Sequence, residues 1–353
     1  MLRRWDVFCR VIDNHGDLGV AWRLSCDLAA RGQRVRLWVD DARALEWMAP
    51  QGRTDVQIVA WSEPAPDLAP ADIVVETFGC NPPAAFVQRM AATALAPIWI
   101  NLEYLTAEAF AERSHGLPSP IHIGGVTLTK RFHFPGFTAA SGGLLREPGL
   151  LEARRGFDRG AWLAAHGLDV RPGECVASLF CYANPALPAL LESLAAAPTL
   201  LLATPGTAAQ QVQALLGPSL RRGALRVHLL PYLTQQSYDG LLWASDLNCV
   251  RGEDSFLRAQ WAARPFLWQA YPQSNDAHAL KLRAFLDRFL ADADAGLATA
   301  LRASFEAWNG LSATGLELPD AKPWRAHCAA WCNALAAQTD LVTRLLGFVE
   351  ETR

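Results

Sequence analysis

The sequence predicts an α/β fold in which two consecutive halves each build a parallel sheet covered by helices on both faces. Short strands that are apolar on both faces recur along the chain, and helical segments separate them. This alternation stops near residue 103 and restarts near residue 160. A chain of 353 residues is also too long for one ordinary core. We therefore expect two domains, with the boundary between residues 150 and 160.

In the first half, the apolar runs predict strands at 5–12, 35–39, 56–59, 72–76 and 98–102. A helix is expected at 19–31, and another is expected to start at Pro82 and Pro83. Glycine, proline and aromatic residues crowd the segment 103–160, which we interpret as long loops that finish the first domain.

The second half repeats the pattern, with strands expected at 175–180, 199–203, 225–230, 247–250 and 265–268. Helices are expected between them at 185–196, 207–216, 234–243 and 255–263. Beyond Pro272 the chain becomes helical, at 276–290 and 297–308, and a single long helix is expected at 323–346.

Composition and charge exclude several classes of function. The net charge of −3 and the pI near 6.2 do not favour binding to nucleic acid or to an anionic membrane. The first residues contain no apolar stretch long enough for a signal peptide, and no run approaches the ~18 apolar residues of a membrane span. We expect a cytoplasmic protein whose eight scattered cysteines are buried thiols. Cys328 and Cys332 lie one helical turn apart beside His327, but without a second ligand pair they indicate core packing rather than a metal site.

A strand, a glycine turn and a helix start follow one another at 247–263, and this arrangement is a potential anion site. Unpaired N–H groups and the helix dipole both face such a turn. Gly252 permits close approach of a ligand, Asp254 or Ser255 can cap the helix, and Arg251 can pair with a phosphate. Glu253 has no evident structural purpose, and we interpret it as a partner for sugar hydroxyls. An ordinary capped helix with solvated charges remains the alternative.

The turn after the first strand carries two carboxylates, Asp13 and Asp17, at a strand end where catalytic groups are usually mounted. The glycine pattern of a dinucleotide-binding turn is incomplete here, with Gly16 and Gly19 and no third glycine. Asp17 can also be read as a helix cap, whereas Asp13 is harder to explain in that way. His15 is interpreted as a loop residue.

Five segments of the chain are distinctive: Asp13-Asn14-x-Gly16-Asp17-x-Gly19-Val20-x-Trp22-Arg23-Leu24, Arg251-Gly252-Glu253-Asp254-Ser255-Phe256-x-Arg258-Ala259-Gln260-Trp261-Ala262, Glu76-Thr77-Phe78-Gly79-Cys80, Phe180-x-Tyr182 and Tyr271-Pro272-Gln273. They resemble the EarP family of protein-arginine rhamnosyltransferases, in an order and spacing that span essentially the whole chain. The departures are small: His15 stands where an aromatic residue is expected, and residues 230–233 are a variant of the family's segment.

The resemblance implies a GT-B glycosyltransferase fold, in which two Rossmann-like domains face each other across a cleft. It implies an acceptor domain at 1–155, a nucleotide-sugar domain at 156–330, and a C-terminal helix at 331–353 that packs back on the first domain. The donor would be dTDP-β-L-rhamnose, the acceptor one arginine of translation elongation factor P, and the reaction would invert the anomeric configuration.

The resemblance also implies roles for individual residues. Asp13 is the expected general base, Asp17 orients the cationic acceptor, and Glu253 is required for activity. Gln235 and Gln236 are adjacent in the sequence, so either can line the donor pocket. The expected substrate-binding residues are Asn14, Gly16, Gly19, Phe180, Tyr182, Gln235, Tyr238, Arg251, Gly252, Asp254 and Ser255.

No metal or other cofactor is expected. The one Asp-x-Asp pair, Asp292 and Asp294, lies between two expected helices and is interpreted as a solvated loop, and His133 and His278 have no partners at ligand spacing. Two other classes stay open: a GT-B-type glycosyltransferase or sugar-nucleotide epimerase acting on a small molecule, and a non-catalytic protein that senses a nucleotide sugar or docks on a translation factor. A pair of aspartates favours a cationic acceptor over a neutral hydroxyl.

Overall fold

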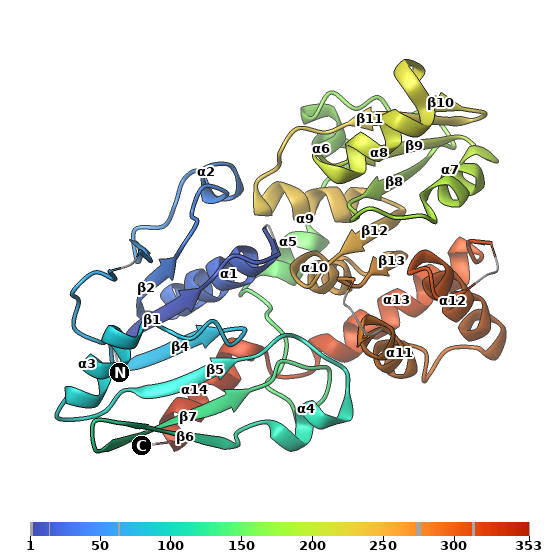
Figure 1. Cartoon of the computed structure of the whole chain (residues 1–353). Helices are drawn as coiled ribbons and strands as arrows, with labels where there is room; N and C mark the ends of the chain where they lie inside the picture. Colours follow the sequence, from blue (N-terminus) through green and yellow to red (C-terminus); the bar gives the residue numbers. More distant parts are fainter. Residues whose placement is uncertain (1–2, 14, 63, 273–276, 313–314, 353) are drawn as a thin grey trace. The chain divides into compact units, whose positions relative to one another are not determined.

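The chain forms two compact α/β units, which are described separately below (Figure 1). A computed structural model describes residues 3–13, 15–62, 64–272, 277–312 and 315–352. Unit 1 comprises Met1–Pro148 and Ala336–Arg353, and unit 2 comprises Gly149–Leu335. The divisions therefore fall after Pro148 and after Leu335, where the sequence suggested residues 155 and 330.

Unit 1 contains a seven-stranded sheet in the order β3-β2-β1-β4-β5-β7-β6. All neighbouring strands pair in parallel except β6 and β7. The expected first five strands are confirmed, with ends shifted by a few residues. The elements up to residue 133 are β1 (Arg4–Cys9), α1 (Gly16–Ala30), β2 (Arg34–Val39), α2 (Leu45–Met48), β3 (Val56–Ala60), β4 (Ile73–Thr77), α3 (Ala84–Ala92), β5 (Ile98–Leu102), α4 (Ala109–Ser114), β6 (Pro118–Ile123) and β7 (Val126–His133).

Apolar side chains on both faces of β1 explain why helices cover both sides of this sheet. Phe8 stacks on Trp38 at a centroid distance of 5.0 Å and meets Phe86 of α3 edge-on at 4.8 Å. These rings belong to a buried cluster that extends to Trp99 of β5. Strand order reverses between β1 and β4, because β2 and β3 follow β1 on one side and β5 follows β4 on the other. Such a switch point is where ligands bind in sheets of this type.

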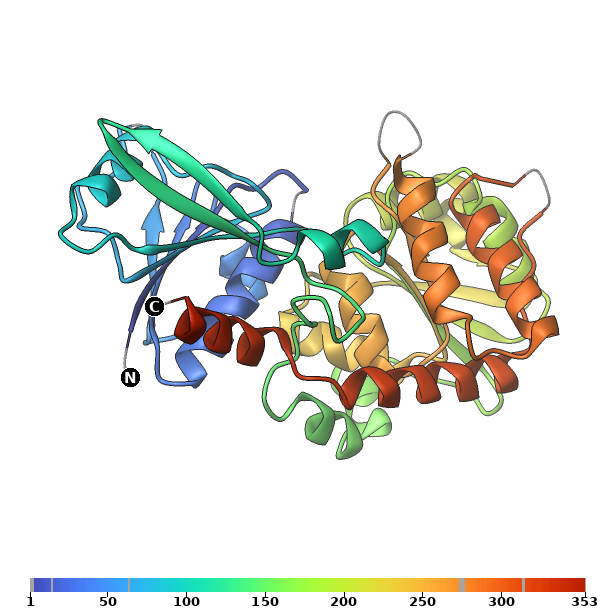
Figure 2. The same cartoon turned by 90° about the horizontal axis from the view of Figure 1, so that it is seen from below.

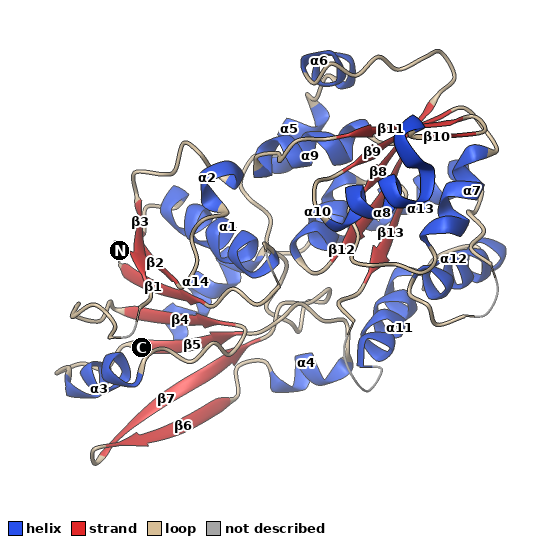
Figure 3. Cartoon of the chain, turned by 45° about the horizontal axis from the view of Figure 1, so that its top comes forward, coloured by secondary structure: helices blue, strands red, loops and turns tan. Residues whose placement is uncertain are grey.

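The expectation of long loops at 103–160 is wrong, because β6 and β7 form an antiparallel hairpin (Figure 3). Its two-residue turn is Gly124-Gly125, and both residues have positive φ, 54° and 82°. Pro118 and Pro120 lack an N–H and are tolerated because β6 is the edge strand. The prolines and the alternating exposure of β6 removed the continuous apolar run by which the other strands were recognised.

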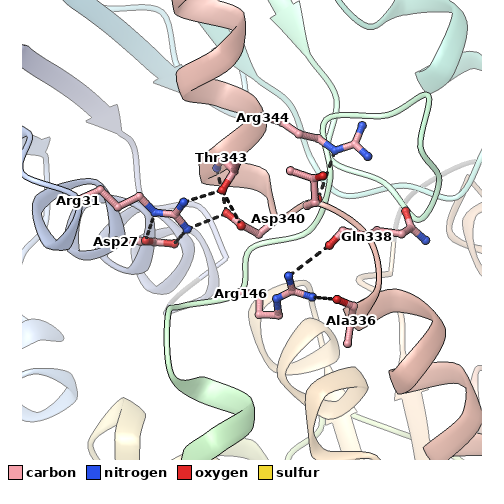
Figure 4. A network of polar contacts seen from close by, with 9 residues as sticks. Asp27, Arg31, Arg146, Ala336, Gln338, Asp340, Thr343 and Arg344 are labelled. Atoms are coloured by element: carbon pink, nitrogen blue, oxygen red, sulfur yellow. Dashed lines mark hydrogen bonds and ion pairs between the residues drawn. The ribbon is translucent and has the colours of Figure 1, made fainter. Parts of the chain in front are cut away.

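The end of the chain returns to unit 1 as a separate helix, α14 (Leu341–Glu351), rather than as the end of one long helix. The preceding helix, α13 (Ala321–Ala336), ends at Ala336, and Asp340 caps the start of α14 by accepting the N–H of Thr343 at 2.9 Å. Helix α14 packs beside α1 (Figure 2). The return segment is held by Arg31, which contacts Asp27 and Asp340, each at 2.7 Å, and by Arg146, which donates to the carbonyl of Ala336 at 2.6 Å (Figure 4).

Unit 2 contains a six-stranded sheet in the order β10-β11-β9-β8-β12-β13, parallel apart from the β10–β11 pair. Right-handed crossovers place α7 and α8 on one face and α9 and α10 on the other. The elements are α5 (Leu150–Arg155), α6 (Arg159–Ala165), β8 (Cys175–Leu179), α7 (Leu187–Ala195), β9 (Thr199–Ala203), α8 (Thr207–Leu216), a 3₁₀ turn (Gly217–Ser219), β10 (Arg221–Arg222), β11 (Leu225–Leu229), α9 (Gln235–Ala244), β12 (Leu247–Arg251), α10 (Asp254–Ala262), β13 (Phe266–Gln269), α11 (Ala277–Phe289) and α12 (Ala295–Trp308), followed by α13.

Six of the eight cysteines are buried as expected, whereas Cys26 and Cys175 are only half-buried. All eight cysteines are free thiols; Cys328 and Cys332 are buried, and His327 bonds the carbonyl of Phe289 at 2.7 Å. Asp294 caps α12 by accepting two backbone N–H groups. Among the described residues, no helix is long and apolar enough to cross a membrane, and no group of three or more metal-ligating side chains lies together.

Candidate active site

The loop between β1 and α1 is organised by the carboxylate of Asp17. Its Oδ2 accepts the backbone N–H groups of Ile12 and Asp13, both at 2.9 Å, and its Oδ1 accepts the hydroxyl of Tyr104 at 3.4 Å. The residue is only 3% exposed. Asp17 therefore holds the loop in shape, and the second acidic residue of the loop, Asp13, is half-buried.

Gly16 makes room for Asp13. A Cβ atom at Gly16 would lie 3.1 Å from Oδ2 of Asp13, tighter than an ordinary contact. The N–H of Gly16 donates to the carbonyl of Asp13 at 2.7 Å, and the N–H of Gly19 donates to that of His15 at 2.9 Å, so both glycines lie in the turn that starts α1. Asn14, also expected to bind substrate, lies outside the described residues.

Burial and like charge make this loop suitable for a cation. Burial raises the pKa of Asp17 above the usual range, and the nearby charge of Asp13 raises it further. The N–H groups of Asp13 and Ile12 and the hydroxyl of Tyr104 oppose that rise, because they stabilise the ionised form. A positively charged side chain bound here would relieve the repulsion between the two carboxylates.

The corresponding turn of unit 2 joins β12 to α10. Gly252 has a φ of 62°, a left-handed conformation that favours glycine. The expectation that Asp254 or Ser255 caps the helix is wrong: Glu253 occupies the cap position, and no side chain bonds the first turn from there. Ser255 instead bonds the backbone of Arg251, and Asp254 pairs with Arg258 at 3.0 Å. A helix start without a side-chain cap has N–H groups suited to an anion.

The guanidinium of Arg251 lies over the faces of two aromatic rings. Its guanidinium carbon lies 4.4 Å from the ring centroid of Phe180 and 4.2 Å from that of Tyr182. The two rings follow β8, which is the neighbour of β12 in the sheet. Tyr182 is fixed in turn by its N–H bond to Gln269 at 2.9 Å and by an edge contact with Tyr271 at 5.3 Å. Stacking fixes the plane of the guanidinium while its edges can still donate hydrogen bonds.

Helix α9 adds two of the expected donor-site residues. The ring of Tyr238 lies edge-on to Phe180 at 6.0 Å, and burial raises the pKa of its phenol. Gln235 is the first residue of α9 and is half-buried, whereas Gln236 is exposed. The donor-site role of either glutamine stays a prediction. Gln273, in the Tyr271-Pro272-Gln273 motif, lies outside the described residues.

Each group of residues flanks a switch point in its own sheet. In unit 1, Asp13 and Asp17 follow β1, next to the reversal between β1 and β4. In unit 2, Phe180 and Tyr182 follow β8 and the Arg251 turn follows β12, and strand order reverses between these two strands. Both groups lie at carboxyl ends of parallel strands, where ligands of such sheets bind.

Some residues at these strand ends were not predicted from the sequence. Tyr104 and Phe78 stack on each other in unit 1 at 4.1 Å. In unit 2, Arg258 is 3% exposed and donates to both oxygens of Asp239 at 2.7 Å, which fixes α10 against α9. Phe78 and Arg258 stand in the quoted motifs, and Tyr104 follows a recognised strand, but nothing in the sequence pairs them with these partners.

Solved glycosyltransferases share this fold. The spinosyn forosaminyltransferase SpnP matches with a TM-score of 0.56 at 12% identity, over 99% of both chains. UGT89C1 of Arabidopsis thaliana matches with a TM-score of 0.55 at 11% identity, also over 99% of both. The protein therefore has the GT-B glycosyltransferase fold that the sequence predicted.

Sequence comparison is more specific. Residues 5–350 match the EarP family, described as elongation-factor P (EF-P) rhamnosyltransferase. Proteins named protein-arginine rhamnosyltransferase are 45% identical in Pseudomonas aeruginosa, over 98% of both chains, and 42% identical in Pseudomonas putida, over 99% of both. A structure solved as the basis for EarP-mediated arginine glycosylation of translation elongation factor EF-P matches at 32% identity and a TM-score of 0.69, over 99% of this chain and 100% of that one. The chain belongs to the EarP family, and the predicted enzyme class, protein-arginine rhamnosyltransferase, is confirmed.

Proposed function

We propose that this protein transfers L-rhamnose from dTDP-β-L-rhamnose to an arginine side chain of translation elongation factor P, with inversion at the anomeric carbon. The observation that carries the proposal is the division of roles between Asp13 and Asp17. Asp17 is buried and holds the loop, and Asp13 is half-buried at the switch point of unit 1. The arginine specificity of the relatives supports the acceptor.

The acceptor chemistry requires such a pair. A guanidinium is a weak nucleophile, because it is protonated and its lone pairs are delocalised. Asp13 would hold the guanidinium and accept one of its protons while a nitrogen attacks the sugar. Asp17 would contribute negative charge to the site, although its oxygens already accept hydrogen bonds from Ile12, Asp13 and Tyr104.

The donor would bind to unit 2. The start of α10 and the guanidinium of Arg251 would stabilise the diphosphate, and the rings of Phe180 and Tyr182 under Arg251 would flank it. Glu253, at the cap position of α10, would bind hydroxyls of the donor. Ser255 would act on the turn itself, because its hydroxyl bonds the backbone of Arg251.

The transfer balances as a single displacement. The C–N bond forms between the guanidinium nitrogen and the anomeric carbon as the C–O bond to the diphosphate breaks, and that electron pair leaves with dTDP. The proton lost from the nitrogen goes to Asp13, and the rhamnosylated guanidinium keeps its positive charge. Stabilisation of the leaving diphosphate by N–H groups and Arg251 is electrostatic, so we expect no metal requirement and activity in the presence of EDTA.

Intact-mass analysis tests this function. Purified protein, dTDP-β-L-rhamnose and elongation factor P should give a factor heavier by one deoxyhexose, and NMR of the product should give an α-linked sugar. An unchanged factor under conditions in which the donor binds would overturn the acceptor assignment. Turnover of a small molecule in its place would support the alternative, a GT-B-type glycosyltransferase or sugar-nucleotide epimerase with a small substrate.

A further inference from the structure

A stacked aromatic pair lies beside the Asp13–Asp17 loop and has no role so far. Phe78 follows β4 and Tyr104 follows β5, and these strands are neighbours in register, with Thr77 opposite Leu102. The two rings lie 4.1 Å apart at an interplanar angle of 10°. The hydroxyl of Tyr104 donates to Oδ1 of Asp17 at 3.4 Å, so the pair adjoins the carboxylate of Asp17.

The backbone holds this pair at a cost. Phe78 has a φ of 59°, a left-handed conformation that is unfavourable for a residue with a Cβ. The N–H of Phe78 donates to the carbonyl of Leu102 at 2.7 Å, and the N–H of Gly79 donates to Oδ1 of Asn101 at 3.1 Å. These bonds fix the end of β4 to the end of β5. Strain that the surroundings maintain in this way is typical of binding sites.

Tyr104 is also unusual in being exposed. It is 37% exposed, although an aromatic ring at a strand end of this sheet could be buried in the core. A ring beside a carboxylate suits one class of ligand in particular. A planar guanidinium stacks on an aromatic face through cation–π attraction while its N–H groups donate to a carboxylate. A neutral hydroxyl acceptor gains neither interaction.

We propose that the Phe78–Tyr104 stack is one wall of the acceptor-arginine subsite. Tyr104 would hold the guanidinium plane against its ring, so that a nitrogen of the fork faces Asp13. Phe78 would support Tyr104 from its other side, and the bond to Asp17 would set the rotation of the ring. This inference rests on the proposed function and assigns the residues that select a cationic, planar acceptor.

Three variants separate the ring from its hydroxyl. In Tyr104→Leu the ring is lost, and the KM for elongation factor P should rise about tenfold, the size of a desolvated cation–π contact. In Tyr104→Phe the ring remains, and the KM should stay within about threefold of wild type. In Phe78→Leu the support is lost while the Tyr104 hydroxyl stays, and the KM should rise by an intermediate factor. Calorimetry should give an unchanged donor Kd for all three.

A matched control is Phe110→Leu, because Phe110 is an exposed aromatic (41%) of the same unit on α4. Its KM should equal that of wild type, and thermal unfolding should establish that each variant is folded. A wild-type KM in both Tyr104→Leu and Phe78→Leu would overturn the inference. Equal losses in Tyr104→Phe and Tyr104→Leu would also overturn it, because the hydroxyl alone would then matter. Failure of the wild-type protein to modify the factor would instead overturn the proposed function.

Discussion

The backbone N–H of Asp13 donates to the carboxylate of Asp17 at 2.9 Å, so the two acidic residues of the first loop are parts of one structure. The same oxygen of Asp17 also accepts the N–H of Ile12. The bond that makes Asp17 a good loop anchor leaves it poorly suited to take a proton from substrate. Asp13 is half-buried on the loop that Asp17 maintains, so the two aspartates are expected to have different roles, Asp13 in catalysis and Asp17 in holding the loop.

Replacement of Asp13 by Asn should abolish turnover and leave the fold intact. A general base contributes about 10²–10⁴-fold, so kcat should fall by at least a hundredfold. Donor affinity and the thermal unfolding midpoint should match wild type, because asparagine has the size and shape of aspartate and Asp13 belongs to unit 1, whereas the proposed donor site belongs to unit 2. Mass analysis of the acceptor and calorimetry with the donor measure both effects. A variant that retains wild-type kcat would exclude Asp13 as the base.

Replacement of Asp17 by Ala should act mainly on stability. Two backbone N–H groups lose their acceptor, and the free energy of unfolding should fall by about 2 kcal/mol. Asp17→Asn keeps one acceptor oxygen and should be milder. Urea unfolding of both variants gives the comparison. If Asp17→Ala is as stable as wild type but inactive, Asp17 acts on the substrate and not on the loop.

Replacement of Glu253 by Gln should reduce turnover or donor affinity at least tenfold without loss of stability. Glu253 occupies the cap position of α10, but its side chain makes no capping bond, so its removal costs no cap. The free energy of unfolding should stay within about 0.5 kcal/mol. Glu152→Gln, on an exposed helix of the same unit, is a suitable control. Normal activity in Glu253→Gln would contradict the donor-site interpretation.

The parallel strands of both units could be predicted because their apolar runs are continuous. The strands at 98–102 and 199–203 and the helix at 207–216 match the structure to the residue. The loops that carry Asp13 and Glu253 were also placed correctly at strand ends, since a strand followed by a glycine turn and a helix is a local pattern. The β6–β7 hairpin was missed because its strands alternate in exposure and contain two prolines.

Contacts between distant residues could not be predicted from sequence alone. Tyr104 and Asp17 are 87 positions apart, and only the order of β1, β4 and β5 in the sheet brings them together. The cap of α10 was misassigned for a related reason. Asp254 is a good capping residue by type, but Arg258 binds its carboxylate in the folded chain. The capping preference of Asp254 is therefore overridden by its salt bridge with Arg258, which also binds Asp239.

Replacement of Arg251 by Lys should weaken donor binding about tenfold. Lysine keeps the positive charge but cannot lie over Phe180 and Tyr182 as a plane, and each cation–π contact contributes about 0.5–2 kcal/mol. Calorimetry with the nucleotide sugar measures the change. Arg222→Lys, at a surface pair with Glu192, should leave donor affinity unchanged. Equal affinity in Arg251→Lys and wild type would mean that charge alone is required.

Stability should fall as pH is lowered below about 6.5, and His133 should cause part of the decrease. Burial, His115 and Arg344 lower the pKa of His133 from 6.5 to about 3, so the folded chain keeps it neutral while the unfolded chain takes up a proton. Between pH 6.5 and about 3 the unfolded state therefore binds more protons than the folded state. The free energy of unfolding should fall by up to about 1.4 kcal/mol for each pH unit in this range. His133→Phe should show a shallower pH dependence in urea unfolding, and the exposed His122→Gln should not. Identical slopes in His133→Phe and wild type would contradict this assignment.

Replacement of Arg31 by Ala should destabilise unit 1 more than replacement of its partner Asp340 by Asn. Arg31 joins α1 to the cap of α14, and its other partner, Asp27, has a fully buried side chain (Figure 4). Burial raises the pKa of Asp27, and Arg31 opposes that rise, so loss of Arg31 leaves a buried carboxylate without its cation. A buried charge without its partner typically costs about 3 kcal/mol or more, whereas Asp340→Asn keeps a capping oxygen and should cost about 1 kcal/mol.

Urea unfolding measures both losses in the free energy of unfolding, and hydrogen exchange should report faster opening of α14 in Arg31→Ala. The double variant Arg31→Ala with Asp27→Ala should recover part of the loss, because no uncompensated charge remains; a double variant less stable than Arg31→Ala alone would mean that Asp27 stabilises the fold without Arg31.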